Sequence, residues 1–203
     1  MARSKKASGS PPKALETSGA PETEVGDPEA QARQICLRLL TIAPRTRAQL
    51  AQALHRRGVP DEAAETVLSR FADVGLIDDA AFARAWVESR HYSRGLSRRS
   101  LSAELRRQGV ESDEIREAVD TLDPEQEVVT ARRLVEQKLA GTRGQPPEVR
   151  IRRAAGTLAR KGYPAGLVFR LIKEVLEQED DAEAQAEVLD LDPDQYLDPD
   201  SGE

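Results

Sequence analysis

Three glycines mark an internal repeat, the feature that most narrows what this chain can fold into. Gly58, Gly109 and Gly162 lie 51 and 53 residues apart, and further identities recur at fixed offsets from each of them. A leucine stands four residues before each glycine and an arginine two residues before it. These are Leu54, Leu105 and Leu158, and Arg56, Arg107 and Arg160. Such periodicity is typical of stacked repeats, because each small unit exposes apolar surface that its neighbours cover.

The apolar residues between positions 31 and 178 follow a helical period. They recur at spacings of three and four, as at Leu50 and Leu54, and no alternating run of strand length interrupts them. Thr46 followed by Gln49 predicts a capping box at a helix start, and each repeated glycine suits the left-handed end of a helix. The sequence therefore predicts an all-α fold of three tandem three-helix repeats, forming an elongated, curved body with disordered termini.

Composition shifts divide the chain into five predicted parts. The first 30 residues are rich in Gly, Pro and Ser and have few large apolar side chains, so residues 1–30 are predicted to be a disordered extension. Repeat 1 is predicted over residues 31–79, repeat 2 over 80–123 and repeat 3 over 124–178. Residues 179–203 are predicted to be an acidic tail, solvated and without structure after about residue 182.

The net charge of −6 hides two opposite regimes. Residues 31–178 carry a net +6, whereas residues 179–203 contain 11 acidic and no basic residues. The body therefore suits an anionic partner, although the whole chain is acidic. We hypothesise that the tail competes electrostatically with DNA phosphate for the basic surface, which would limit loose DNA binding.

Other absences narrow the class of protein. The single Cys36 excludes an internal disulfide and a cysteine-based zinc site. No stretch reaches the roughly 18 apolar residues that a membrane span needs, and the start lacks the apolar core of a signal peptide. We expect a soluble, cytoplasmic protein that does not bind membranes.

A compact motif follows the first repeated glycine. It comprises Gly75, Leu76, Ile77, Asp78, Asp79, Phe82, Ala83, Trp86, Val87 and Arg90. With this motif, and with its neighbours up to Gly109, the chain resembles the RecX family of recombinase regulators over about residues 32–178. The resemblance implies three tandem three-helix repeats. It also implies binding in the groove of the RecA filament on single-stranded DNA, with inhibition of ATP hydrolysis, strand exchange and co-protease action.

Taken residue by residue, the motif is predicted to be structural. Its two acids precede a helix start, where carboxylates cap the helix and favour its dipole, and we prefer this to a metal-binding pair. Phe82 and Trp86 lie four apart on one helical face, so we expect a core stripe between repeats rather than a base-stacking pair. Leu76 and Ile77 are also predicted to lie in the core.

No arrangement of residues predicts catalysis. His55 and His91 do not stand in a metal-ligand spacing, and no Gly-rich loop ends in Lys-Ser or Lys-Thr, which excludes a P-loop ATPase. We therefore predict no catalytic residue, no metal and no cofactor.

Arginines outnumber lysines by 23 to 3 in residues 31–178 and predict a partner-binding surface, because guanidinium groups bind phosphate and carboxylate bidentately. At about 100° per residue, Arg99 and Arg106 face away from the core, as do Arg153 and Arg160. The predicted binding residues are Arg90, Arg94, Arg98, Arg99, Arg106, Arg107, Arg150, Arg152, Arg153, Arg160 and Lys161. Arg56, Arg107 and Arg160 lie in the last helical turn before a glycine. For these three, stabilising the negative end of the helix is as good an explanation as binding a partner.

Two partners compete for this surface, namely DNA phosphate and the acidic surface of a RecA filament. The resemblance favours a non-enzymatic, monomeric regulator that binds the RecA filament, with direct DNA contact as a secondary interaction. The alternatives are a sequence-independent DNA-binding protein with helix-turn-helix-like modules and an adaptor for another protein.

Overall fold

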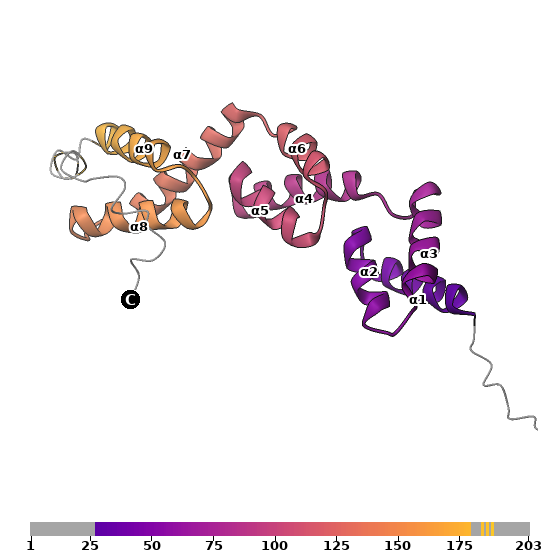
Figure 1. Ribbon diagram of the computed structural model, residues 1–203. Coiled ribbons are helices and arrows are strands. Elements are labelled where there is room, and N and C mark those ends of the chain that lie inside the picture. Colours follow the sequence, from indigo (N-terminus) through magenta and orange to yellow (C-terminus); the bar gives the residue numbers. More distant parts are fainter. Residues whose placement is uncertain (1–26, 180–183, 185, 187, 189–203) are drawn as a thin grey trace, which may run out of the picture.

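The computed structural model describes residues 27–179 together with residues 184, 186 and 188, and every regular element in these residues is an α-helix. The helices α1 to α9 form three successive groups of three, laid end to end in an elongated, curved body (Figure 1). This arrangement confirms the predicted all-α fold of three tandem three-helix repeats. The predicted disorder of residues 1–26 lies outside the described residues.

Repeat 1 consists of α1 (Pro28–Ile42), α2 (Arg47–His55) and α3 (Asp61–Asp73). The hydroxyl of Thr46 caps α2 by accepting a hydrogen bond from the Gln49 amide at 3.2 Å, as the capping motif predicted. The core forms where α2 packs against α1 and α3.

Repeat 2 consists of α4 (Asp79–Arg94), α5 (Arg98–Gln108) and α6 (Ser112–Asp120). Ser97 caps α5 through its hydroxyl, which accepts from the amide of Ser100 at 3.3 Å. Repeat 2 therefore copies the middle-helix start of repeat 1, with serine in place of threonine.

Repeat 3 consists of α7 (Pro124–Ala140), α8 (Pro147–Arg160) and α9 (Ala165–Gln178). Its middle helix has 14 residues, whereas the middle helices of repeats 1 and 2 have 9 and 11. The difference lies mainly at the helix start, because α8 begins 15 residues before its glycine, whereas α2 and α5 begin 11 residues before theirs.

The repeated glycines end the three middle helices. Their φ angles are 71°, 80° and 84° at Gly58, Gly109 and Gly162, in the left-handed region that glycine tolerates. The apolar residues at matching offsets are buried, including all three leucines four residues earlier. These are Leu54, Leu105 and Leu158, preceded by Leu50, Leu101 and Ala154 and followed by Val67, Ala118 and Leu171. The repeat read from the sequence is thus the repeat of the structure.

Each repeat has a hydrophobic core of its own, and the three cores do not merge within the described residues. Neighbouring repeats must be held together largely by polar contacts and close backbone approach rather than by a shared core.

The two ends of the body differ from the sequence prediction. The predicted N-terminal extension reached residue 30, but α1 already begins at Pro28, because Asp27 caps it by accepting from the Glu29 amide at 3.0 Å. At the other end, Ala184 and Val188 are buried in the core of repeat 3, so a solvated tail from residue 182 is wrong at these positions. The rest of the tail after residue 188 lies outside the described residues.

Candidate functional site

The motif that follows α3 is a turn that connects two repeats. Gly75 has a φ of 72°, and Ile77 fills the core of repeat 1. Leu76, by contrast, is 48% exposed, which corrects its prediction as a core residue. It lies in the turn itself, where only one of the two neighbouring apolar side chains points inward. Asp78 caps α4 by accepting from the Ala81 amide at 2.7 Å, as predicted.

The aromatic pair of the motif belongs to repeat 2 rather than to a contact between repeats. Phe82 and Trp86 stack with their ring centroids 5.5 Å apart and pack against the core of repeat 2. The Trp86 indole donates to a Glu104 carboxylate oxygen at 2.8 Å, and the Arg90 guanidinium lies 4.3 Å from the indole centroid. Trp86 therefore joins α4 to α5, and the expected stripe between repeats is wrong.

The junction between repeats 1 and 2 is a set of contacts around the start of α2. The Thr46 hydroxyl donates to the Gln108 carbonyl at 2.7 Å, and the Arg47 amide donates to the Asp79 carboxylate at 2.9 Å and 3.2 Å. A Cβ atom on Gly109 would lie only 2.3 Å from the Ala48 Cβ. The first turn of α2 thus packs on the end of α5. A carboxylate of α4 accepts a hydrogen bond from one of the amides at the start of α2 that have no partner within that helix.

The junction between repeats 2 and 3 repeats this design around the start of α5. The Ser97 amide donates to the Lys161 carbonyl at 3.0 Å, and the Arg98 amide donates to a Glu127 carboxylate oxygen at 2.8 Å. A Cβ atom on Gly162 would lie 2.6 Å from the Ser97 hydroxyl. At both junctions the middle helix of one repeat therefore packs on the glycine turn of the next repeat. The first amide of that helix donates a hydrogen bond to a carboxylate of the next repeat, Asp79 at the first junction and Glu127 at the second.

Three further contacts strengthen the second junction. The Tyr163 hydroxyl donates to the Gly95 carbonyl at 3.1 Å, and burial raises the pKa of this tyrosine, which keeps the donor protonated. His91 Nδ1 donates to the Leu96 carbonyl at 2.9 Å, so His91 Nε2 accepts from the Thr130 hydroxyl at 2.9 Å. The Lys161 ammonium also donates to the Arg94 carbonyl at the end of α4.

Three of the predicted binding residues are engaged by other side chains of the protein and remain at least partly exposed. Arg90 contacts Trp86 and lies 3.8 Å from the Glu104 carboxylate, Arg98 pairs with Asp120 at 2.5 Å, and the exposed Arg152 lies 3.8 Å from Glu148. These pairs reduce the charge available to a partner. Arg98 in particular ties α5 to α6 and has a structural role.

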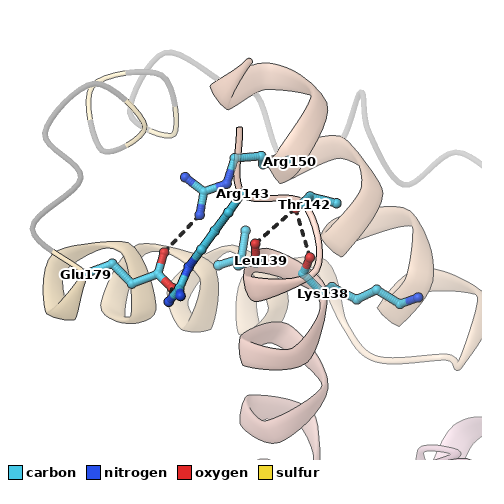
Figure 2. A network of polar contacts seen from close by, with 6 residues as sticks. All are labelled: Lys138, Leu139, Thr142, Arg143, Arg150 and Glu179. Carbon is cyan, nitrogen blue, oxygen red and sulfur yellow. Dashed lines mark hydrogen bonds and ion pairs between the residues drawn. The ribbon is translucent and has the colours of Figure 1, made fainter. Parts of the chain in front are cut away.

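Arg150 is a correction to the predicted surface. It is 6% exposed and forms an ion pair with Glu179 at 2.8 Å. Figure 2 shows Arg143 and Arg150 converging on Glu179, beside the turn in which the Thr142 hydroxyl donates to the carbonyls of Lys138 and Leu139. Because a buried, paired guanidinium cannot reach a partner, Arg150 leaves the binding surface. Glu179, predicted as the first residue of the tail, instead belongs to repeat 3, where it pairs with Arg143 and Arg150.

The other predicted cations have no ion-pair partner within the part of the chain that the structure describes. Arg99 and Arg106 are exposed on α5 and Arg153 is exposed on α8, as the helical geometry predicted, and Arg107 of α5 is exposed as well. Three more lie at helix ends of the second junction, namely Arg94, Arg160 and Lys161. These seven side chains form the candidate surface.

The last three border a cleft of about 730 Å³ between α4, α7 and α8. Its cationic lining residues are Arg94, Arg133, Arg160 and Lys161, and none of its lining residues is acidic. Burial, together with the positive charges of Lys138 and Arg94, lowers the pKa of Lys161. The cleft therefore concentrates positive charge that described acidic residues do not neutralise, which suits an anionic ligand.

Sequence reasoning missed two residues of this cleft, Tyr92 and Arg133. Arg133 belongs to α7 and reaches the others only through the fold of the junction. A signal did exist for Tyr92, since it follows Val87 of the apolar stripe by five residues, which places it about 140° away from that stripe on α4.

Neither a metal site nor a membrane span emerges from the described residues. They contain no group of three or more His, Cys, Asp and Glu side chains placed to hold a metal ion. None of their helices has the length and apolar character needed to cross a membrane.

The fold and this surface define an all-α protein of tandem three-helix repeats with a basic face on repeats 2 and 3. Family models for the RecX first, second and third three-helix domains match residues 32–71, 78–119 and 125–172. The chain belongs to the RecX family of regulatory proteins.

Individual relatives agree with this assignment. The chain is 62% identical to the regulatory protein RecX of Thermobifida fusca over 162 residues, covering 80% of this chain and 85% of the relative. It is 61% identical to the regulatory protein RecX of Streptomyces coelicolor, covering 75% and 81% of the two chains. A crystal structure of a regulatory protein RecX matches with a TM-score of 0.66 and 26% identity, over 73% of this chain and 74% of that one.

Proposed function

We propose that this protein is a non-enzymatic regulator of RecA that binds as a monomer in the groove of the RecA filament on single-stranded DNA. Membership of the RecX family supports the regulatory role. The observation that carries the mode of action is the elongated body with cations on successive repeats. Such a body can contact several subunits of a filament at once, as a compact domain of the same size cannot.

Binding in this way would hinder RecA without chemistry by the regulator. A body that bridges neighbouring RecA subunits restrains the movements that ATP turnover requires. Inhibition of ATP hydrolysis, of strand exchange and of co-protease action would then share one cause.

The exposed face of α5 is the part of the surface we assign to the filament. Arg99, Arg106 and Arg107 have no described ion-pair partner and project from the middle repeat. They can engage acidic side chains or phosphate without breaking a contact of the fold. Arg98, which pairs with Asp120, is excluded from this set.

We further propose that the acidic residues after position 188 compete with DNA for the basic surface. Deleting residues 190–203 should then raise DNA affinity at low salt, with little change at high salt. This deletion spares Glu179, Ala184 and Val188, which belong to repeat 3. Unchanged DNA affinity after the deletion would contradict the competition.

The direct test is the DNA-dependent ATPase of RecA with the full chain titrated in. We expect inhibition that is complete near a stoichiometric ratio of protein to filament sites. No inhibition, together with tight binding to DNA lacking RecA at physiological salt, would favour the sequence-independent DNA-binding protein instead. Capture of a different protein partner without any effect on RecA would favour an adaptor.

A further inference from the structure

We propose that the cleft between repeats 2 and 3 binds a single nucleic-acid strand, with its cations on the phosphodiester backbone and the Tyr92 ring stacked on a base. The proposal deepens the proposed function, because a RecA filament holds such a strand. It does not depend on that function, since the cleft would bind a free strand as well.

The charge of the cleft points to phosphate. Arg94, Arg133, Arg160 and Lys161 converge from three different helices on one hollow of about 730 Å³ that has no acidic lining residue. Guanidinium groups bind phosphate oxygens bidentately. Their convergence from distant parts of the chain fits an anion that several groups contact together.

Stabilisation of helix ends explains only part of this arrangement. Arg94 and Arg160 lie in the last turns of α4 and α8, and Lys161 donates to the Arg94 carbonyl. Arg133, however, lies within α7, where no helix end needs a cation. It is exposed and has no ion-pair partner among the described residues, so the structure of the protein alone does not account for it.

The aromatic residue distinguishes a nucleic-acid strand from other anions. Tyr92 lines the cleft but is 85% exposed, unlike Tyr163 nearby, which is buried and hydrogen-bonded. Leu96 and Leu134 add apolar surface to the same lining. Positive charge beside an open aromatic ring is typical of single-strand binding, because unpaired bases expose flat faces to stack on it. A carboxylate-rich peptide has no such face, and a duplex hides its bases.

The test uses the full chain and a fluorescein-labelled oligothymidylate of about 16 nucleotides, followed by anisotropy over a series of salt concentrations. Tyr92→Ala should lower affinity roughly 5- to 150-fold, whereas Tyr92→Phe should keep most of it. Arg133→Gln should reduce the slope of log affinity against log salt by about 0.7. The matched control Arg84→Gln removes an exposed arginine of α4 outside the cleft and should leave the slope unchanged.

Several outcomes would overturn the proposal. Wild-type affinity in Tyr92→Ala, or an equal loss in Tyr92→Phe, would remove the stacking role. A slope in Arg133→Gln equal to that of Arg84→Gln would remove the phosphate contact. Displacement of the strand by a polyglutamate peptide whose own binding resists Tyr92→Ala would assign the cleft to an acidic protein segment. The anisotropy assay contains no RecA, so its result is independent of the RecA ATPase assay. A failure to inhibit RecA would contradict the proposed function and leave the cleft assignment intact.

Discussion

The two junctions of the body share one design but differ in what surrounds it. In both, the middle helix of one repeat rests on the glycine turn of the next, and an acid from the next repeat closes its first amide. The first junction adds a hydrogen bond between the side chains of Gln49 and Gln108. The second adds buried contacts from His91 and Tyr163 and the packing of Leu134 beside Gly95.

This difference predicts which junction is flexible and which is stiff. Contacts that are few and partly exposed open more easily than buried ones. We therefore expect the first junction to act as the hinge and the second to hold repeats 2 and 3 as a unit. The basic cleft lies at the second junction, between helices that this unit would hold together.

The start of α8 differs from the starts of α2 and α5. The first residue of α8 is Pro147, which has no amide hydrogen for a following repeat to close. The helix also begins about one turn earlier than its counterparts. The start of α8 thus lacks the first-residue amide hydrogen that α2 and α5 donate to an acid of the next repeat.

The largest expected effect is at the glycine turn of the first junction. In Gly58→Ala the positive φ alone should cost about 1–2 kcal/mol of unfolding free energy, because open space surrounds the new Cβ. In Gly109→Ala the new Cβ also meets Ala48, which should cost about 1–3 kcal/mol more. Urea unfolding of both variants measures this difference. Equal losses would show that the repeats are not in close contact there.

The next effect concerns the second junction. Tyr163→Phe removes the donor to the buried Gly95 carbonyl and should lower the unfolding free energy by about 1–3 kcal/mol. Tyr92→Phe is the matched control, since Tyr92 is exposed, and should change it by less than about 0.5 kcal/mol. Thermal unfolding followed by circular dichroism compares the two. A loss in both variants, or in neither, would contradict the importance of this contact.

A smaller effect tests whether the two junctions share their amide contact. Asp79→Ala and Glu127→Ala each leave a helix amide without its acceptor and should each cost about 1 kcal/mol. Asp79→Asn and Glu127→Gln keep an acceptor oxygen and should recover most of that loss. If Asp79→Asn and Glu127→Gln destabilise the protein as much as the alanine variants do, the hydrogen bond to the helix amide is not what the two junctions share.

The smallest effect is a pH dependence at the first junction. Burial raises the pKa of Asp79 above its ordinary value of 3.8, and the Arg47 amide and charge oppose this only in part. The folded state then binds the proton more tightly than the unfolded state, so Asp79 favours folding increasingly as the pH falls towards the raised pKa. The stability of the wild type relative to Asp79→Asn should therefore rise between pH 7 and pH 4. A fall over the same range would contradict the raised pKa.

The repeat could be predicted from the sequence because one position in each unit demands an unusual backbone. The glycines, the leucines before them and the outward arginines of α5 follow from helical period and end chemistry alone. The family motif likewise identified Asp78 as a cap. These are local properties, determined by residues within one or two turns.

What the sequence could not show depends on contacts between distant segments. Arg150 resembles its neighbours in sequence, but it becomes buried because Glu179 reaches it from the far end of repeat 3. Asp79 closes an amide 32 residues away. The cleft combines α4, α7 and α8, so Arg133 could be placed in it only when the second junction was known.

The central claim is that the basic face of repeats 2 and 3 carries regulation of RecA, and the RecA ATPase tests it most directly. The rate of DNA-dependent ATP hydrolysis would be measured with stoichiometric wild type and with the triple variant Arg99→Gln, Arg106→Gln and Arg107→Gln. We predict strong inhibition by the wild type and much weaker inhibition by the triple variant, at equal helicity. Undiminished ATP hydrolysis with the wild type, or equal inhibition by both proteins, would contradict the account.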